Sequence, residues 1–234
     1  MADASFFALF AAVFGGVRLL QRRANIKQVT ENLRAIRALA STPITYEPCD
    51  ERWQAALRGL EVPATMTALG DCLEVADARA APMPIRAFAS GDGVIFGWFA
   101  LYGPRQLPAA MLWSSREDDS YVTRLVPGGS AAIAWPPFIH REDVAARRGI
   151  AVALARHRER IADVKGLRTV ATLAELQSEI TRIRARTIAW RQSQAPAELL
   201  DKDLRAALGR HYASYGPALA KRLSVEMPEA RVVS

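Results

Sequence analysis

The sequence is poor in the residues that build metal and disulfide sites. Its 234 residues include two cysteines, Cys49 and Cys72, and three histidines, His140, His157 and His211. The cysteines form no C-x-x-C pair, and no histidine has a second ligand at the spacing of a motif such as H-E-x-x-H. We therefore predict no metal site. Two free thiols fit a reducing cytoplasm, whereas a disulfide between them would fit a domain on the outer side of the membrane.

Motifs for nucleotide and nucleophile chemistry are also missing. The chain has no Walker A loop, G-x-G-x-x-G fingerprint or G-x-S-x-G elbow. Gly91-Asp92-Gly93 precedes a strand pattern rather than a helix, so it predicts a hairpin tip and not a phosphate cradle. We expect no cofactor and no catalytic residue. An enzyme of unrecognised type is an alternative, and it would require His140, His157 and the acidic turn Glu117–Asp119 to converge.

Lysine is scarce, because 27 of the 31 basic residues are arginine, and the net charge is +7. The positive charge concentrates in residues 1–40 and 141–191. Many arginines have an acidic partner at helical spacing, as Arg147 has in Asp143. We therefore expect no nucleic-acid partner. Anionic lipid headgroups are a second, weaker expectation from the placement of the charges.

One long apolar run is present, at the start of the chain. Arg18 interrupts it near one end, where a long side chain can reach the headgroups. Counted from Ala4, the run that contains Ser5–Leu20 is 17 residues long, the short end of what spans a bilayer. Its bulky members are Phe6, Phe7, Leu9, Phe10, Val13 and Phe14. Basic residues follow the run rather than precede it, which predicts a membrane anchor over residues 1–23 with everything after it in the cytoplasm. The alternative is an apolar helix buried against protein.

The segment after the anchor, residues 24–48, has the pattern of an amphipathic connector helix and a linker. Ile26, Val29, Leu33 and Ile36 recur at spacings of three and four, within a helix expected over Gln21–Leu39. Such a stripe needs a surface, which its own domain, a protein partner or a second protomer would supply. We therefore treat it as a candidate partner-facing stripe.

Residues 49–136 have the pattern of an antiparallel sheet region that begins with a short helix, Asp50–Leu60. Asp-Gly in Gly91–Gly93 predicts a hairpin. Val94–Tyr102 is apolar on both faces, which predicts a central strand covered on both sides. Leu69-Gly70-Asp71 resembles a turn. The expected strands are Ile85–Ser90, Val94–Tyr102, Ala110–Ser114, Tyr121–Val126 and Ala131–Trp135, within a meander of four to six strands.

Residues 137–225 are expected to be helical and to pack on the sheet, and residues 226–234 to form a tail. The three predicted helices are His140–Val164, Thr172–Gln192 and Leu199–Leu223, with a bend at Gly216-Pro217. Thr172–Gln192 carries nearly three heptads, which favours packing in an antiparallel helical hairpin. The fold class is therefore α+β: an N-terminal helix, an antiparallel meander and three C-terminal helices.

Three tryptophans fall on or at the end of neighbouring strands: Trp98, Trp113 and Trp135. They suggest an alternative function, a small-molecule-sensing module with a tryptophan-lined pocket on the sheet. Aromatic residues on adjacent strands more often form the core beneath helices.

Four features together resemble uncharacterised bacterial proteins that have an N-terminal anchor and a small α+β domain. They are Leu69-Gly70-Asp71, Asp92-Gly93, the apolar strand Val94–Tyr102 and Arg156-His157-Arg158. The resemblance covers residues 66–165 and implies a bacterial inner-membrane location, without a function to transfer. The anchor and the connector, in a chain with no chemical motif, predict a non-enzymatic accessory or scaffold subunit of a membrane-associated assembly.

Overall fold

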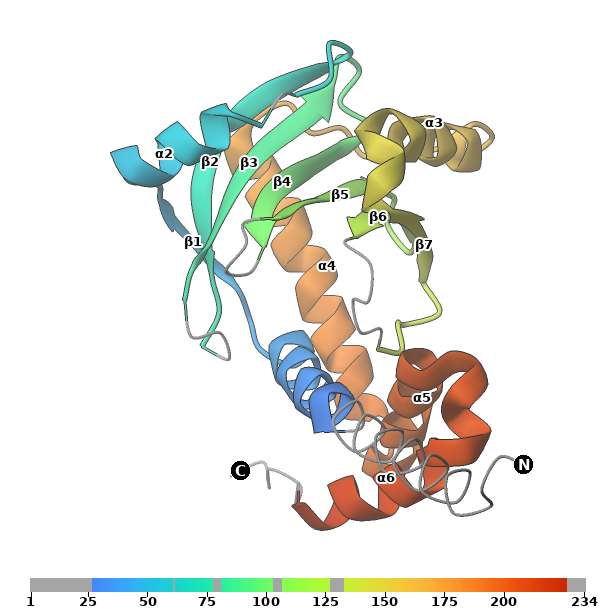
Figure 1. Cartoon of the computed structure of the whole chain (residues 1–234). Helices are drawn as coiled ribbons and strands as arrows, with labels where there is room; N and C mark the ends of the chain where they lie inside the picture. The colour runs from blue at the N-terminus through green and yellow to red at the C-terminus, as the bar shows by residue number, and fades with distance from the viewer. Residues whose placement is uncertain (1–26, 61, 78–80, 103–106, 127–132, 227–234) are drawn as a thin grey trace, which may run out of the picture. The chain divides into compact units, whose positions relative to one another are not determined.

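The structure is a computed structural model that describes residues 27–60, 62–77, 81–102, 107–126 and 133–226 (Figure 1). The chain divides into two compact units, of which the larger comprises Ala38–Ser130 and Ala134–Ala195. The described part of the smaller unit is mainly residues 27–37 and 196–226. The predicted anchor lies outside the described residues. Within the described ranges, no helix combines the length and the apolar character needed to cross a membrane.

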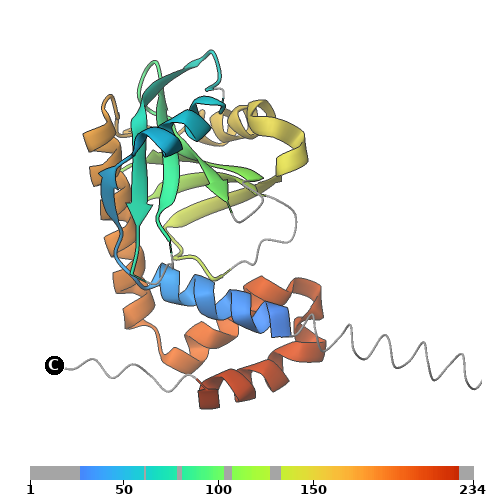
Figure 2. The ribbon, with the colours of Figure 1, turned by 60° about the vertical axis from the view of Figure 1, so that its left-hand side comes forward.

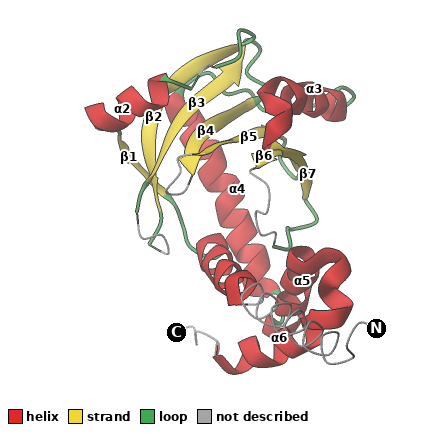
Figure 3. Cartoon of the chain, viewed as in Figure 1, coloured by secondary structure: helices red, strands yellow, loops and turns green. Residues whose placement is uncertain are grey.

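A seven-stranded sheet forms the centre of the larger unit, with its strands in sequence order (Figure 3). The strands are β1 (Thr45–Pro48), β2 (Met66–Val75), β3 (Met83–Ser90), β4 (Phe96–Tyr102), β5 (Leu107–Ser115), β6 (Ser120–Val126) and β7 (Ile139–Ala145). Strands β1 to β6 pair antiparallel, whereas β7 lies parallel to β6. The α+β class is confirmed, but a purely antiparallel meander of four to six strands is wrong.

The parallel orientation of β7 depends on the segment that connects it to β6. A parallel pair needs a crossover connection, because the chain must return to the end of the sheet from which β6 started. Residues 133–138 belong to that connection and form no strand. The strand predicted at Ala131–Trp135 is therefore wrong over residues 133–135, and its first two residues lie outside the described ranges. The helix predicted from His140 is wrong at its start, because Ile139–Ala145 is β7 and the helix begins only at Gly149.

Strand β2 is the other part of the sheet that differs from the sequence-based prediction. The turn predicted at Leu69-Gly70-Asp71 is a bulge inside one strand, where the pairing with β3 shifts between Ala68 and Gly70. Gly70 has φ +142°, a conformation that residues with a side chain rarely adopt. The strand then continues, and Asp71 forms an ion pair of 2.9 Å with Arg86 on β3.

Helix α4 (Leu173–Ser193) covers one face of the sheet (Figure 2). Its first turn is held by a capping box, in which Thr172 and Glu175 exchange hydrogen bonds. Its apolar stripe packs on β3 to β7: Leu176, Ile180 and Ile183 share a cluster with Ala87, Phe96, Trp113, Val122 and Ile139. The helix predicted at Thr172–Gln192 is confirmed. Its heptad face lies on the sheet rather than on another helix.

Helix α3 (Gly149–Ile161) covers the opposite face. Ala153, Leu154 and Ile161 pack against apolar side chains of β3, β4 and β5, which are Phe88, Phe99 and Leu112. Phe96 and Phe99 are therefore buried on opposite sides of β4, which confirms the prediction of a central strand covered on both faces. Helix α2 (Glu51–Arg58), capped by Asp50, contacts β3.

The smaller unit consists of helices. Residues 27–40 are helical, although only residues up to Arg37 belong to this unit, and α5 (Pro196–Leu208) and α6 (Tyr212–Glu226) supply the rest. Its buried apolar residues include Leu33, Leu199, Leu200, Leu204, Leu219 and Leu223. The single helix predicted over Leu199–Leu223 is wrong, because a 3₁₀ turn at Gly209–His211 separates α5 from α6. Gly209 there has φ +49°. Gly216-Pro217 lies within α6.

Candidate functional site

His157 on α3 is fully buried and links that helix to the sheet. Its Nε2 lies 3.0 Å from Ser114 Oγ on β5, and its Nδ1 lies 2.9 Å from Thr123 Oγ1 on β6. Ser114 Oγ donates to the carbonyl of Val94 at 2.7 Å. Thr123 Oγ1 also accepts a hydrogen bond of 3.1 Å from Arg160, which lies one turn after His157 on α3.

These partners determine the direction of each hydrogen bond. Ser114 gives its only hydrogen to a carbonyl, so it must accept from Nε2–H of His157. Nδ1 then accepts from Thr123, whose oxygen accepts from Arg160. A serine nucleophile needs the imidazole as an acceptor, and here the imidazole donates to the serine. Burial and the charge of Arg160 also lower the pKa of His157 to about 3. The Ser114–His157 pair is therefore a structural connection rather than a catalytic one.

The acidic turn between β5 and β6 is held by arginines of α4. Arg182 and Arg186 both donate to the carbonyl of Glu117, at 3.3 and 2.8 Å. Arg182 also pairs with Glu179, which is buried and accepts from Ser115 at 2.5 Å. Burial opposes the ionisation of Glu179, but hydrogen bonds from Arg182 and Ser115 outweigh it and lower its pKa. These charges fasten the turn to the helix.

His140 and Asp119, two groups that an unrecognised enzyme would need to bring together, do meet. His140 Nε2 lies 3.4 Å from Asp119 Oδ1, and its ring stacks on Tyr121 with centroids 4.9 Å apart. Asp119 is also hydrogen-bonded to Arg116, which lowers the pKa of that carboxyl. The pair is half exposed, and His157 has both ring nitrogens occupied elsewhere. Within the described ranges, no three His, Cys, Asp or Glu residues could hold a metal ion together.

The three tryptophans do not share one environment. Trp98 is 8% exposed and packs with Ile85 and Cys72, whereas Trp113 is 5% exposed and packs under α4. Trp135 is tilted against Trp113 with ring centroids 6.4 Å apart. The guanidinium groups of two arginines, Arg124 and Arg141, lie over its ring. Trp98 and Trp113 therefore serve as core residues.

The connector stripe also lies partly inside the chain. Leu33 is 1% exposed, while Val29 and Ile36 are half-buried. Ile26, like the anchor residues Phe6, Phe7, Leu9, Phe10, Val13, Phe14 and Arg18, lies outside the described residues. A partner could thus reach Val29 and Ile36, but Leu33 already belongs to the core of the smaller unit.

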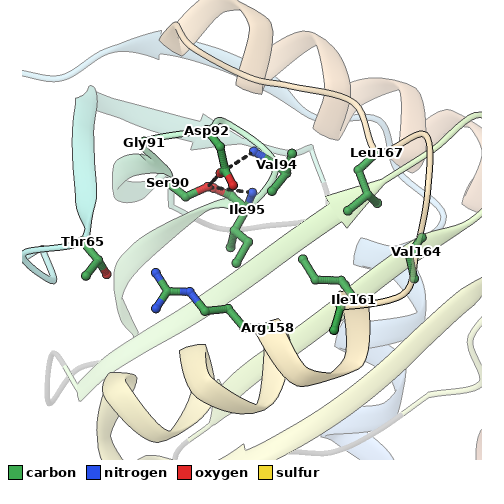
Figure 4. A pocket seen from close by; sticks show the side chains of 11 residues that line it. Thr65, Ser90, Gly91, Asp92, Val94, Ile95, Arg158, Ile161, Val164 and Leu167 are labelled. Atoms are coloured by element: carbon green, nitrogen blue, oxygen red, sulfur yellow. Dashed lines mark hydrogen bonds between the residues drawn. The ribbon is translucent and has the colours of Figure 1, made fainter.

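One open groove of about 470 Å³ is formed between the β3–β4 hairpin tip and the C-terminal end of α3 (Figure 4). Its polar members include Thr65, Ser90, Asp92 and Arg158. Its apolar lining is Val94, Ile95, Ile161, Ala162, Val164 and Leu167. Figure 4 shows the guanidinium of Arg158 at one end of the groove, with Val164 and Leu167 at the other.

The hairpin tip satisfies its own polar groups. Ser90 Oγ donates to Asp92 Oδ1 at 2.5 Å, and the amide of Val94 donates to the same oxygen at 3.2 Å. These bonds, chiefly the one from Ser90, hold the pKa of Asp92 below its ordinary value. Gly93, at φ +72°, lets Val170 of the segment before α4 pair with the tip, since its carbonyl accepts from the Val170 amide at 3.0 Å. The tip residues on this wall of the groove are thus hydrogen-bonded within the chain.

The two sides of this groove carry different signals in the sequence. Turn chemistry predicts the Asp-Gly tip, but no local pattern connects it with Arg158 of Arg156-His157-Arg158. Because they lie more than sixty positions apart, no local spacing brings them together. Comparisons with protein-family models, curated proteins and solved structures yield no match for this chain. The groove is therefore interpreted from its own residues.

Proposed function

We propose that the chain is a non-enzymatic, membrane-anchored accessory or scaffold subunit. It would bind a larger membrane-associated assembly, or a second copy of itself, through a cytoplasmic α+β domain at the bacterial inner membrane. The observation that carries this proposal is the apolar run Ser5–Leu20, which Arg18 interrupts near its end and which Arg22, Arg23 and Lys27 follow. A few residues later the chain enters the helix over residues 27–40, so an anchor would join directly to a folded helical unit.

The first experiment is fractionation of the full-length protein. We expect it to sediment with membranes and to be released only by detergent. The double substitution Phe10→Glu and Val13→Glu should release it, because charge within a short apolar run opposes insertion. Ser178→Glu with Thr181→Glu, both on the exposed side of α4, is the matched control and should stay bound. Wild-type protein that is soluble without detergent would overturn the anchor.

Orientation requires reporter cysteines, because the native thiols are poor probes. Cys49 and Cys72 are 7% and 2% exposed, and burial raises the pKa of both thiols, that of Cys72 to about 11. Ser178→Cys should be labelled only after the cell is opened, whereas Asp3→Cys should be labelled from outside. The reverse pattern would place the α+β domain outside the cytoplasm.

The accessory role needs its own test. Removing residues 1–39 would also remove Leu33 and Arg37, which belong to the smaller unit, so the cleaner deletion is residues 1–23. We expect this deletion to abolish co-purification of a membrane-associated complex. Replacing residues 1–23 by an unrelated membrane helix should restore it if the folded units supply the contacts. Partners that persist without any anchor would contradict the proposal.

A further inference from the structure

The groove between the β3–β4 tip and α3 has a feature that the anchored-subunit proposal does not use. Arg158 makes no hydrogen bond or ion pair with any residue in the described part of the chain, although its charge contributes to the lowered pKa of Asp92. Its neighbours on α3 differ: Arg156 pairs with Glu142 at 2.6 Å, and Arg160 donates to Val122 and Thr123. Arg158 is exposed, and its guanidinium group lies at the groove (Figure 4).

The rest of the groove limits what could bind there. The hairpin residues Ser90 and Asp92 make one wall polar, whereas Ile95, Ile161 and Leu167 give the groove an aliphatic part (Figure 4). A guanidinium binds a carboxylate through two parallel N–H···O bonds, and an aliphatic wall stabilises an alkyl chain. The volume of about 470 Å³ lies within the range of small-ligand sites, about 300–1,000 Å³.

Asp92 determines which anion fits. It is ionised at neutral pH and lies on the wall of the same groove, so the net charge that the groove presents is small. Asp92 repels any anion in the groove, but it repels a monocarboxylate less than a dianion such as a phosphate monoester, and Arg158 supplies one positive charge for it. We propose that this groove binds a monocarboxylate that carries an aliphatic chain, with Arg158 on the carboxylate and Ile95, Ile161 and Leu167 on the chain. This inference is independent of the anchor.

The test is a titration of the full-length protein with hexanoate, followed through the ¹H–¹⁵N resonances of residues 90–95 and of the Arg158 side chain. For an open groove and a ligand this small, we expect saturable shifts with a dissociation constant of about 1–10 mM. Arg158→Gln should weaken binding at least about tenfold, because a charge-assisted bidentate contact is lost. Arg147→Gln, at an exposed arginine outside the groove, is the matched control and should bind as the wild type does.

A second variant tests the shape of the groove, and two further ligands test the charge that it binds. Ala162→Phe fills the groove without removing a charge and should also abolish the shifts. Hexanol should bind at least about tenfold more weakly than hexanoate, because it has no charge for Arg158. Hexyl phosphate binding more tightly than hexanoate would overturn the assignment to a monoanion. Absence of saturable shifts, or shifts that are equal in Arg158→Gln, would overturn the groove as a ligand site.

Discussion

A single buried histidine shows how one side chain connects two layers of this protein. The imidazole of His157 uses both nitrogens, and burial with the charge of Arg160 lowers its pKa from 6.5 to about 3. Between those two pH values, the unfolded chain binds a proton that the folded chain does not. The contribution of His157 to stability is therefore complete above pH 6.5 and decreases as the pH falls toward 3.

This linkage gives a measurable pH dependence. The free energy of unfolding of the wild type, relative to His157→Gln, should fall by about 1.4 kcal/mol for each pH unit in that window. Urea unfolding at several pH values measures the slope. His211→Gln, at an exposed histidine on the turn after α5, should keep the wild-type slope. An unchanged slope in His157→Gln would mean that the buried imidazole is protonated in the folded protein.

Gly97 shows the effect of a missing side chain. It lies on β4, and a Cβ built at this position would be 2.0 Å from the carbonyl oxygen of Met111 on β5. Gly97→Ala must therefore push the two strands apart, and we expect it to lower the free energy of unfolding by about 2 kcal/mol or more. Gly91, at the hairpin tip, has nothing within 4 Å of its Cβ position, so Gly91→Ala should change stability by less than about 0.5 kcal/mol. Similar losses in the two variants would contradict this packing.

At the scale of elements, α4 holds together several parts of the larger unit. Its apolar face packs on the sheet, Arg182 and Arg186 hold the β5–β6 turn, and Arg184 donates to the carbonyl of Thr42 at 3.1 Å. These contacts all depend on where the helix starts. The capping box at Thr172 and Glu175 satisfies amide groups that no helical carbonyl can reach.

Loss of this cap should weaken the whole helix. Thr172→Ala removes the acceptor of the Glu175 amide and should lower the free energy of unfolding by about 1 kcal/mol. Hydrogen exchange should become faster in the first turn of α4. Ser178→Ala, an exposed position in the same helix, should be close to neutral. If both variants behaved alike, the cap would not contribute.

At the scale of the whole molecule, the two units have separate cores. The large clusters under α3 and α4 draw their residues from the larger unit. In the smaller unit, an ion pair of 3.3 Å joins Arg37 to Asp203, whose side chain is fully buried, and so connects two segments far apart in sequence. Removal of one member of a buried ion pair is destabilising, because the remaining charge loses the attraction that offsets its desolvation.

Arg37→Gln should therefore destabilise the smaller unit by about 3 kcal/mol. Hydrogen exchange should show loss of protection in α5 and α6 while β5 stays protected. Arg205→Gln is the matched control, because its ion pair with Asp201 is exposed and exposed pairs contribute little to stability. Equal loss of protection in β5 would mean that the two units unfold together.

Local pattern in the sequence was enough to predict the features that depend on near neighbours. The three- and four-residue spacing from Leu173 to Trp190 determined α4, the Asp-Gly pair determined the β3–β4 hairpin, and the two-sided apolar pattern of Val94–Tyr102 determined a covered central strand. Each is set by backbone geometry within a few residues.

Tertiary structure alone decided the rest, because those features depend on contacts between distant residues. β7 pairs with β6 after a crossover connection, and this pairing makes a strand of residues that the sequence pattern predicts as the start of a helix. The sheet, rather than a second helix, covers the apolar face of α4. His157 has partners on two strands, and Arg158 lies in one groove with the hairpin tip because α3 packs on the sheet. Sequence spacing does not specify such long-range contacts, because burial and strand pairing across the whole domain determine them.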